Sequence, residues 1–516
     1  MLISLIAVSP IAVLILLAFF LRRDFLTSAI LALVTLLGIS IFIWQIAPVT
    51  MFAATAKGIF VALEIIAIIF GALLVLEIFK KMGGEHAAQQ VFNKISPDYK
   101  IKVILIAWTL VVFLEGISGF GTPAMIAAPI LIAIGVAPII SVIISLIGGS
   151  LPVAFGAAGL PIMYGMASVV GDRLALEAGS IIVALNIITA PLVVATILFI
   201  ASKEKDRWRE IRNNFAFIIF ASLAVSIPSF IAFHLLGPEL TSIIGGISGM
   251  IIISLYAVTQ NALKKVKVLK FSAKNVLPFV PYIVVAMLLT VTRISYINNF
   301  LREVWVIDIY SILGTELNHS LSPLLSPSIA FFAAAMIFFV GLLIRRSNRG
   351  SNIIETISNV VQKLIRPVVA LITILVFVQI MLNSGVNNAG LPNMIVSAAY
   401  IFNNAGQIIA MLIAPIIGAL GSFIAGSATV SNLLFSSIQQ SAALMSGNKE
   451  SVILAMQGMG SSAGSVIAMH NILAVLAIAG LGVHSERKVL KANLTYLVIY
   501  LGFTGILGLV VTALLV

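Results

Sequence analysis

Long apolar runs separated by short polar segments are the main pattern along this chain. Twelve runs, each with about 17 or more apolar residues, are long enough to cross the ~30 Å hydrocarbon core of a membrane. The alternating ten-residue segments of a membrane β-barrel are not found. We therefore predict an all-α polytopic membrane protein. The predicted spans are 1–21, 25–46, 58–79, 137–170, 179–201, 213–235, 241–259, 276–292, 323–344, 364–383, 451–483 and 493–515.

Two further apolar stretches, 103–136 and 405–443, have polar, glycine-rich centres and are predicted to be re-entrant hairpins. The first contains Glu-Gly-Ile-Ser-Gly-Phe-Gly-Thr-Pro at 115–123, and the second is rich in Gly, Ser and Thr over 418–432. Glycine and proline at this density break a helix, and irregular backbone at membrane depth survives only where protein or a water-filled cavity covers it. A kinked helix, or a loop between two short spans, is the alternative.

Each predicted hairpin is followed by a unit too long for one plain span. Residues 137–170 carry a Gly- and Pro-rich break at 148–161, and residues 451–483 carry Gln-Gly-Met-Gly-Ser-Ser-Ala-Gly-Ser at 457–465. We expect each unit to be two half-helices around an unwound centre. Hairpin and broken helix thus occur twice and enter from opposite sides, which is the inverted repeat of many secondary transporters. The predicted division is N-terminal scaffold 1–57, first repeat 58–201, linking scaffold helices 202–363 and second repeat 364–516.

The distribution of basic residues gives the orientation. With Met1 outside, the predicted cytoplasmic loops carry 24 of the 30 Lys and Arg residues and the external loops carry four. This charge bias is retained only if residues 103–136 and residues 405–443 each enter and leave the membrane on the same side. We therefore predict a multi-pass plasma-membrane protein with both termini extracellular and with cytoplasmic loops at 203–212 and 264–274.

Composition excludes several classes of site. The chain has no Cys and only five scattered His, so disulfides, thiol catalysis and a zinc centre are not expected. No cofactor is predicted. The net charge of +12 reflects the cytoplasmic loops, so nucleic acid is not an expected partner, whereas the lipid bilayer is.

Several motifs resemble the lactate permease family. They are Glu115-Gly116 with Gly119-Phe-Gly-Thr-Pro123, Pro152-Val-Ala-Phe-Gly156, Gly418-Ala-Leu-Gly-Ser-Phe423 and Thr429-Val-Ser-Asn432. The resemblance implies proton-coupled import of L-lactate, D-lactate or glycolate, and kinship with ion-transporter folds that move a transport domain against a fixed scaffold. A homodimer is the assembly to test first.

The two hairpin tips are expected to meet and to form the substrate site. No Lys or Arg lies in them, so a carboxylate would be held by backbone N–H groups and neutral side chains, with phenylalanines closing over its methyl group. Helix–helix hydrogen bonding and core packing are the alternative roles. The candidate substrate-binding residues are Ser118, Gly119, Phe120, Gly121, Thr122, Phe155, Ser422, Phe423, Gly426, Ser427, Thr429, Ser431, Asn432, His470 and Asn471.

Two acidic residues within predicted spans are candidate proton carriers. Glu115 lies at the first hairpin's polar turn, where burial would favour its neutral form, although it could instead lock the turn through hydrogen bonds. Glu64 lies on the same helix face as Lys57, so an ion pair competes with a proton role. Glu77 is expected to pair with Lys80 or Lys81.

Three other functions compete with a proton-coupled carrier. A sodium-coupled carboxylate carrier could use Ser427, Thr429 and Asn432 as cation ligands. A membrane enzyme would need a nucleophile–base set that the scattered acids and histidines do not offer. A channel would be indicated by repeated pore segments, which fit the two inverted hairpins less well.

Overall fold

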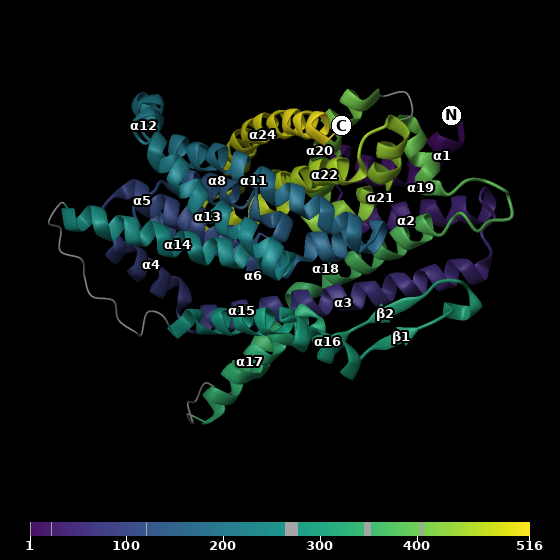
Figure 1. Cartoon of the computed structure of the whole chain (residues 1–516), viewed down its shortest axis with the longest axis horizontal. Coiled ribbons are helices and arrows are strands. Elements are labelled where there is room, and N and C mark those ends of the chain that lie inside the picture. Colours follow the sequence, from purple (N-terminus) through teal and green to yellow (C-terminus); the bar gives the residue numbers. More distant parts are fainter. Residues whose placement is uncertain are drawn as a thin grey trace.

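The computed structural model describes residues 2–21, 23–119, 121–263, 277–344, 352–402 and 406–515. Nearly all of it is helical. Within these ranges, ten helices are long and apolar enough to cross a membrane, and twelve if each of two bent helix pairs is one span. In Figure 1, α24 (Glu486–Leu515) lies near the top of the view and α3 (Pro48–Lys81) runs across its lower half. The chain is therefore a polytopic helical membrane protein, as predicted.

Two long helices, α3 and α18 (Asn352–Leu382), pack against each other and form one side of the molecule. Gly58 permits their close approach, because a Cβ there would lie 2.9 Å from the Val376 backbone. The Lys363 ammonium lies 2.6 Å from the Glu77 carboxylate, and Lys81 lies 3.6 Å from Glu355. Glu77 therefore pairs across to α18 rather than with Lys80 or Lys81 on its own helix.

The first predicted hairpin is a helix–turn–helix unit. Helix α6 (Val111–Ile117) ends just after Glu115, a short turn follows, and α7 (Thr122–Ala133) packs back against α6 and the π-helical segment η2 (Leu105–Leu110). The break after it also forms as expected. Helix α8 (Pro138–Gly148) ends at the first glycine of the motif, and Ala157, Ala158 and Gly159 all have left-handed backbone angles. The rest of this unit comprises η3 (Pro152–Phe155), α9 (Gly156–Leu160), η4 (Pro161–Met166) and α10 (Ala167–Val170).

The second hairpin has longer arms than the first. Helices α20 (Gly406–Ala425) and α21 (Ala428–Ser446) pack against each other, and only Gly426 and Ser427 lie between them. With 20 residues, α20 is itself long and apolar enough to cross a membrane. The glycine-rich segment 418–425 therefore stays helical, contrary to the pattern seen at the first hairpin.

The predicted break of the second unit, 457–465 followed by Met-His-Asn at 469–471, forms only near its end. Helix α22 (Glu450–Gly464) runs through residues 457–464 and continues as η12 (Ser465–Ile467), and the chain bends by 43° only at Ala468, before α23 (Met469–Ile478). The glycines of this segment serve helix packing instead, since a Cβ at Gly460 would overlap the Pro415 carbonyl of α20.

Part of the linking region 202–363 packs on the helices that precede it. Helices α13 (Phe215–Leu236) and α14 (Pro238–Leu263) pack against each other and against α11 (Asp172–Ala201) and α6. Later in the chain, β1 (Ile307–Ile309) and β2 (His319–Leu321) form an antiparallel pair in which Ile307 is paired with Leu321. The pattern of apolar runs did not predict these strands.

The remaining elements are shorter or flank these groups. They are α1 (Leu2–Ile15), η1 (Leu16–Phe20), α2 (Phe25–Phe42), α4 (Gly84–Ile95), α5 (Tyr99–Ile104), η5 (Glu204–Asp206), α12 (Arg207–Asn213), η7 (Leu277–Phe279), α15 (Val280–Arg293), α16 (Ser295–Val304), η8 (Ile312–Gly314), η9 (Pro323–Leu325), α17 (Pro327–Ile344), α19 (Met394–Ala399), η11 (Tyr400–Phe402) and η13 (Val483–Ser485).

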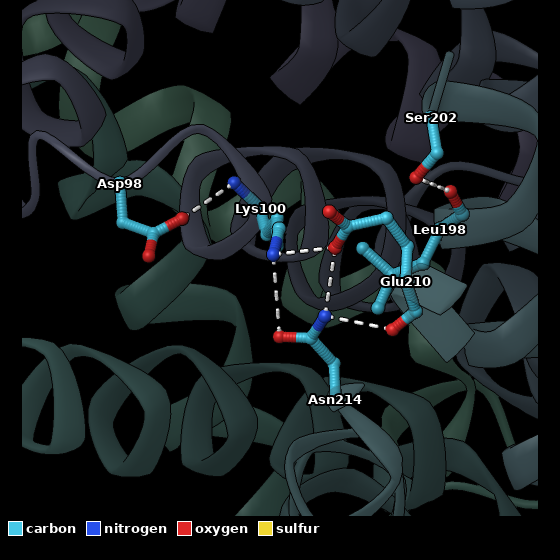
Figure 2. Close-up of polar contacts among 6 residues, drawn as sticks. All are labelled: Asp98, Lys100, Leu198, Ser202, Glu210 and Asn214. Atoms are coloured by element: carbon cyan, nitrogen blue, oxygen red, sulfur yellow. Dashed lines mark hydrogen bonds and ion pairs between the residues drawn. The ribbon is translucent and has the colours of Figure 1, made fainter. Parts of the chain in front are cut away.

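Two basic loops meet at one end of the molecule, where α4 and α12 lie on the left of Figure 1. The Lys100 ammonium lies 2.5 Å from the Glu210 carboxylate, and the Asn214 amide donates to the same carboxylate over 2.9 Å (Figure 2). The hydrogen bond from Lys100 holds the pKa of Glu210 below its usual value. This network ties the start of the first hairpin to the start of α13.

Candidate functional site

A cavity lies where both hairpin turns meet both broken units. Including the open solvent at its mouth it measures about 550 Å³. Gly119, Gly121 and Pro123 line it together with residues 426–429, so the two tips lie close together as expected. The lining residues are Val111, Glu115, Gly119, Gly121, Pro123, Ala124, Ser145, Leu146, Gly149, Val153, Gly156, Ala157, Pro161, Gly426, Ser427, Ala428, Thr429, Ser465 and Asn471.

Both hairpin turns lie against the first turn of α23. Gly121 and Gly426 have φ angles of +74° and +65°, which L side chains rarely adopt. A Cβ at Gly121 would overlap the amide of Asn471, and a Cβ at Gly426 would overlap the ring of His470. Glycine is thus required at these two turns both by backbone conformation and by space.

Glu115 is the one ionisable residue among those described as lining the cavity. Its side chain is only 4% exposed. A Cβ at Gly156 would lie 2.9 Å from its carboxylate, and one at Gly119 would lie 3.5 Å from it, so small residues leave room for the carboxylate. Within the part of the chain that the structure describes, this carboxylate has no ion-pair or hydrogen-bond partner.

Ser118 and Thr122 hold the first turn together instead of lining the cavity. The two hydroxyls lie 2.7 Å apart, the Leu114 carbonyl lies 2.9 Å from the Ser118 hydroxyl, and the Gly119 carbonyl lies 2.8 Å from the Thr122 hydroxyl. Each hydroxyl has one proton, so the two protons serve two of these three contacts. Both side chains are buried. Their hydrogen bonds therefore shape the turn whose glycines face the cavity.

At the second hairpin, three predicted residues including Gly426 line the cavity, whereas Ser422, Ser431 and Asn432 do not. Ser427 and Thr429 line the cavity, and the Ser427 hydroxyl also caps α21 by accepting from the Val430 N–H over 3.4 Å. Ser431 donates to the Gly418 carbonyl over 2.7 Å, and the Asn432 amide donates to the Pro161 carbonyl over 2.9 Å. Ser422 is buried, and its hydroxyl has no hydrogen-bond partner among the described residues.

The expectation that phenylalanines close over the substrate is not met by the two that the structure describes. Phe155 points into a second, smaller cavity and packs against Phe233, with ring centres 5.5 Å apart. Phe423 packs against Phe19, with ring centres 5.4 Å apart. Both rings therefore pack against other helices and do not line the cavity. Phe120 lies outside the described residues.

Glu64 lies away from the cavity. Its carboxylate is 2.9 Å from Nε2 of His319, a residue of β2, and both side chains are largely buried. Phe60 stacks on the same histidine, with ring centres 5.6 Å apart. The partner of Glu64 is therefore a residue of a distant strand and not Lys57.

Of the two residues predicted on α23, Asn471 lines the cavity and His470 does not. The Asn471 amide donates to the Ser465 carbonyl over 3.2 Å, which leaves its oxygen facing the first hairpin turn. The His470 ring lies against Gly426 and is partly exposed.

The sequence analysis did not identify the cavity-lining residues that the first broken unit contributes. Ser145, Gly149, Val153, Gly156, Ala157 and Pro161 all line it. The signal was available, because 148–161 is predicted to be unwound, and unwound backbone facing a cavity is where small residues become a binding surface.

Comparison with known proteins places the chain in a family. A family model described as L-lactate permease matches residues 3–515. The chain belongs to the L-lactate permease family. A putative L-lactate permease of Haemophilus influenzae is 28% identical, with 89% of each chain covered. An L-lactate permease of Streptococcus iniae is 30% identical over 73% of this chain and 77% of its own, and a glycolate permease of Escherichia coli is 23% identical over 91% and 89%.

Family membership and the apolar helices together define the class of protein. The chain is a multi-pass membrane protein of a transporter family rather than of an enzyme family. The cavity is the place in the described structure where both hairpins and both broken units converge, so it is the candidate transport site.

Proposed function

We propose that this protein is a secondary active transporter that imports L-lactate and related short 2-hydroxy monocarboxylates, D-lactate and glycolate, by proton symport. Family membership supports the substrate class, because the relatives are lactate and glycolate permeases. The observation that carries the coupling is Glu115, a buried carboxyl that lines the cavity without a basic residue among the other lining residues.

Charge balance in the cavity links substrate to proton. Two negative charges about 4 Å apart repel by ~4 kcal/mol at an effective dielectric constant near 20. An ionised Glu115 would therefore disfavour a carboxylate in the same cavity, and a proton on Glu115 removes this repulsion. One proton also cancels the ~2.3 kcal/mol per 100 mV that a lone anion needs to enter an inside-negative cell.

Two helix N-termini face the same cavity and supply the attraction for an anion. Helices α7 and α21 both begin at the cavity wall, at Thr122 and Ala428. The first N–H groups of a helix lack partners within the helix, and the helix dipole is positive there. At the start of α7 the Thr122 N–H already donates to the Gly119 carbonyl over 3.1 Å, and Pro123 has no N–H. We therefore assign the substrate carboxylate to the N–H groups at the start of α21, with Ser427, Thr429 and Asn471 beside it.

We further propose that transport proceeds by alternating access of elevator type, based on an inverted repeat. The order long helix, hairpin, broken unit, long helix occurs twice, as α3 to α11 and as α18 to α24. Helix α7 packs against α23, and α21 packs against η4, so each hairpin contacts the other repeat's broken unit. Because α13 and α14 pack on α6 and α11, we place them with the moving domain, and α2, α3, α17 and α18 with the scaffold.

Uptake by the purified protein in proteoliposomes tests the proposal. Labelled lactate should accumulate under an inward proton gradient in sodium-free buffer. With Glu115→Gln, lactate exchange should persist while pH-driven accumulation is lost, because the neutral amide mimics the protonated acid but carries no proton.

Glu64→Gln is the matched control, since it removes another membrane-embedded carboxylate that lies outside the cavity. It should leave pH-driven accumulation intact. Unchanged accumulation by Glu115→Gln would contradict the proton role of Glu115, and a strict requirement for sodium in the wild-type protein would replace proton symport with sodium coupling.

A further inference from the structure

One face of α24 contacts both broken units, at residues next to those that line the cavity. Asn493, Tyr496 and Tyr500 are spaced three and four residues apart, so they lie on one helix face, and all three are buried. None of them lines the cavity among its described residues. The hydrogen-bond partners of Tyr496 and Asn493 explain why α24 buries these two polar side chains.

Tyr496 holds the first helix break. Its hydroxyl lies 2.6 Å from the Ser150 hydroxyl, which is fully buried immediately after the lining residue Gly149. The Ser150 hydroxyl also donates its proton to the Ile147 carbonyl over 2.7 Å. A serine has one hydroxyl proton, so Tyr496 must be the donor and Ser150 the acceptor in the contact between them.

Asn493 binds the C-terminal end of the first half of the second broken unit. Its amide donates to the Val466 carbonyl over 2.7 Å, next to the lining residue Ser465. The Ser462 hydroxyl of the same unit donates to the Leu151 carbonyl of the first break over 3.3 Å. Helix α24 and the two breaks thus form one hydrogen-bonded assembly, made from residues far apart in the sequence.

We propose that Tyr496 and Asn493 are positioning residues for the transport site: they fix the two helix breaks at the spacing that carboxylate binding requires. Backbone at a break has lost its helical partners, so a side-chain bond from a third helix determines where each break lies. The inference rests on the proposed function, since it concerns the binding of the transported carboxylate.

A double-mutant cycle tests the first bond. Tyr496→Phe and Ser150→Ala each remove one partner of it and leave the cavity lining unchanged. We expect each to raise the apparent KM for lactate exchange about three- to tenfold, the loss typical of one buried hydrogen bond, with little change in maximal rate. The rise in the double variant should be smaller than the product of the two single effects, because both variants lose the same Tyr496–Ser150 bond, while Ser150→Ala also loses its bond to the Ile147 carbonyl.

Hydrogen exchange of the full-length protein supplies a readout that needs no substrate. Tyr496→Phe should speed amide exchange over residues 145–161, and Asn493→Leu should speed it over residues 463–471. Tyr500→Phe is the matched control, because it removes a buried hydroxyl from the same helix that has no hydrogen-bond partner among the described residues. It should change neither segment.

The outcomes separate this inference from the proposed function. If the wild-type protein does not transport lactate but the exchange changes appear, the proposed function fails and the clamping of the breaks by α24 stands. If lactate is transported but Tyr496→Phe behaves like Tyr500→Phe, or if the KM effects of Tyr496→Phe and Ser150→Ala multiply, the positioning role is overturned.

Discussion

At the scale of single residues, the turn glycines are the positions least open to substitution. Gly121 and Gly426 combine a left-handed backbone with a neighbour that occupies the Cβ position. Pattern reading identified both glycines from their shared spacing, but not the reason for them. That reason lies in α23, which follows the second hairpin in the chain and packs against both turns.

Gly426→Ala should destabilise the protein by more than the backbone strain alone. A non-glycine residue in the left-handed region costs ~1–2 kcal/mol, and the overlap with His470 adds to it. Gly480→Ala is the control, since Gly480 has φ +69° and open space around it. Thermal unfolding should rank Gly426→Ala below Gly480→Ala, and His470→Ala should restore part of the difference. Equal stabilities would show that the His470 ring moves aside freely.

At the scale of helices, glycine-rich segments have two different roles in this protein. In 148–161 they accompany unwound backbone, whereas in α20 and α22 they let two intact helices pack closely. Composition does not distinguish the two roles. The distinction comes from the partner, because Gly460 faces the Pro415 carbonyl of α20, while Ala157–Gly159 face the cavity or the start of α14.

Gly460→Ala should therefore weaken the packing of α22 on α20. The added methyl group would overlap the Pro415 backbone, which cannot rotate away, and overpacking of this kind costs ~1–3 kcal/mol. Gly502→Ala in α24 adds the same methyl group where nothing lies within 4 Å, and it should be neutral or stabilising. The unfolding midpoints of the two variants in the same detergent provide the measurement, and a tolerated Gly460→Ala would contradict close packing at this position.

At the scale of the whole molecule, loop charge and tertiary structure agree on which loops share a side. Helices α4 and α12, which belong to two basic loops, lie at one end, whereas β1 and β2 lie towards the other (Figure 1). The side that faces the cytoplasm follows from the positive-inside rule.

Cysteine labelling in intact cells tests the orientation of the chain in the membrane. The labelling is specific to the introduced residue because the chain has no native cysteine. Lys205→Cys lies in an exposed position of a predicted cytoplasmic loop, and Arg173→Cys replaces a side chain that is 91% exposed in a predicted external loop. A membrane-impermeant maleimide should label Arg173→Cys in intact cells and Lys205→Cys only after permeabilisation. The reverse pattern would invert the orientation.

The sequence by itself determined the class of protein, the approach of the two turns to each other and the position of Glu115 beside the cavity. These follow from local properties: an apolar run, a cluster of glycine and proline, or a charge without a nearby counterion in the chain. The first helix break was predictable for the same reason, since Ala154–Pro161 contains the glycines and prolines that unwind it.

Only the tertiary structure decided which side chains face the cavity and what holds them. Phe155 and Phe423 pack on Phe233 and Phe19, Glu64 pairs with His319, and Ser150 is held by Tyr496. Each partner lies at least 78 residues away in the chain, the separation between Phe155 and Phe233. Hydropathy reports that a segment is buried but not which neighbour buries it, and orientation depends on that neighbour.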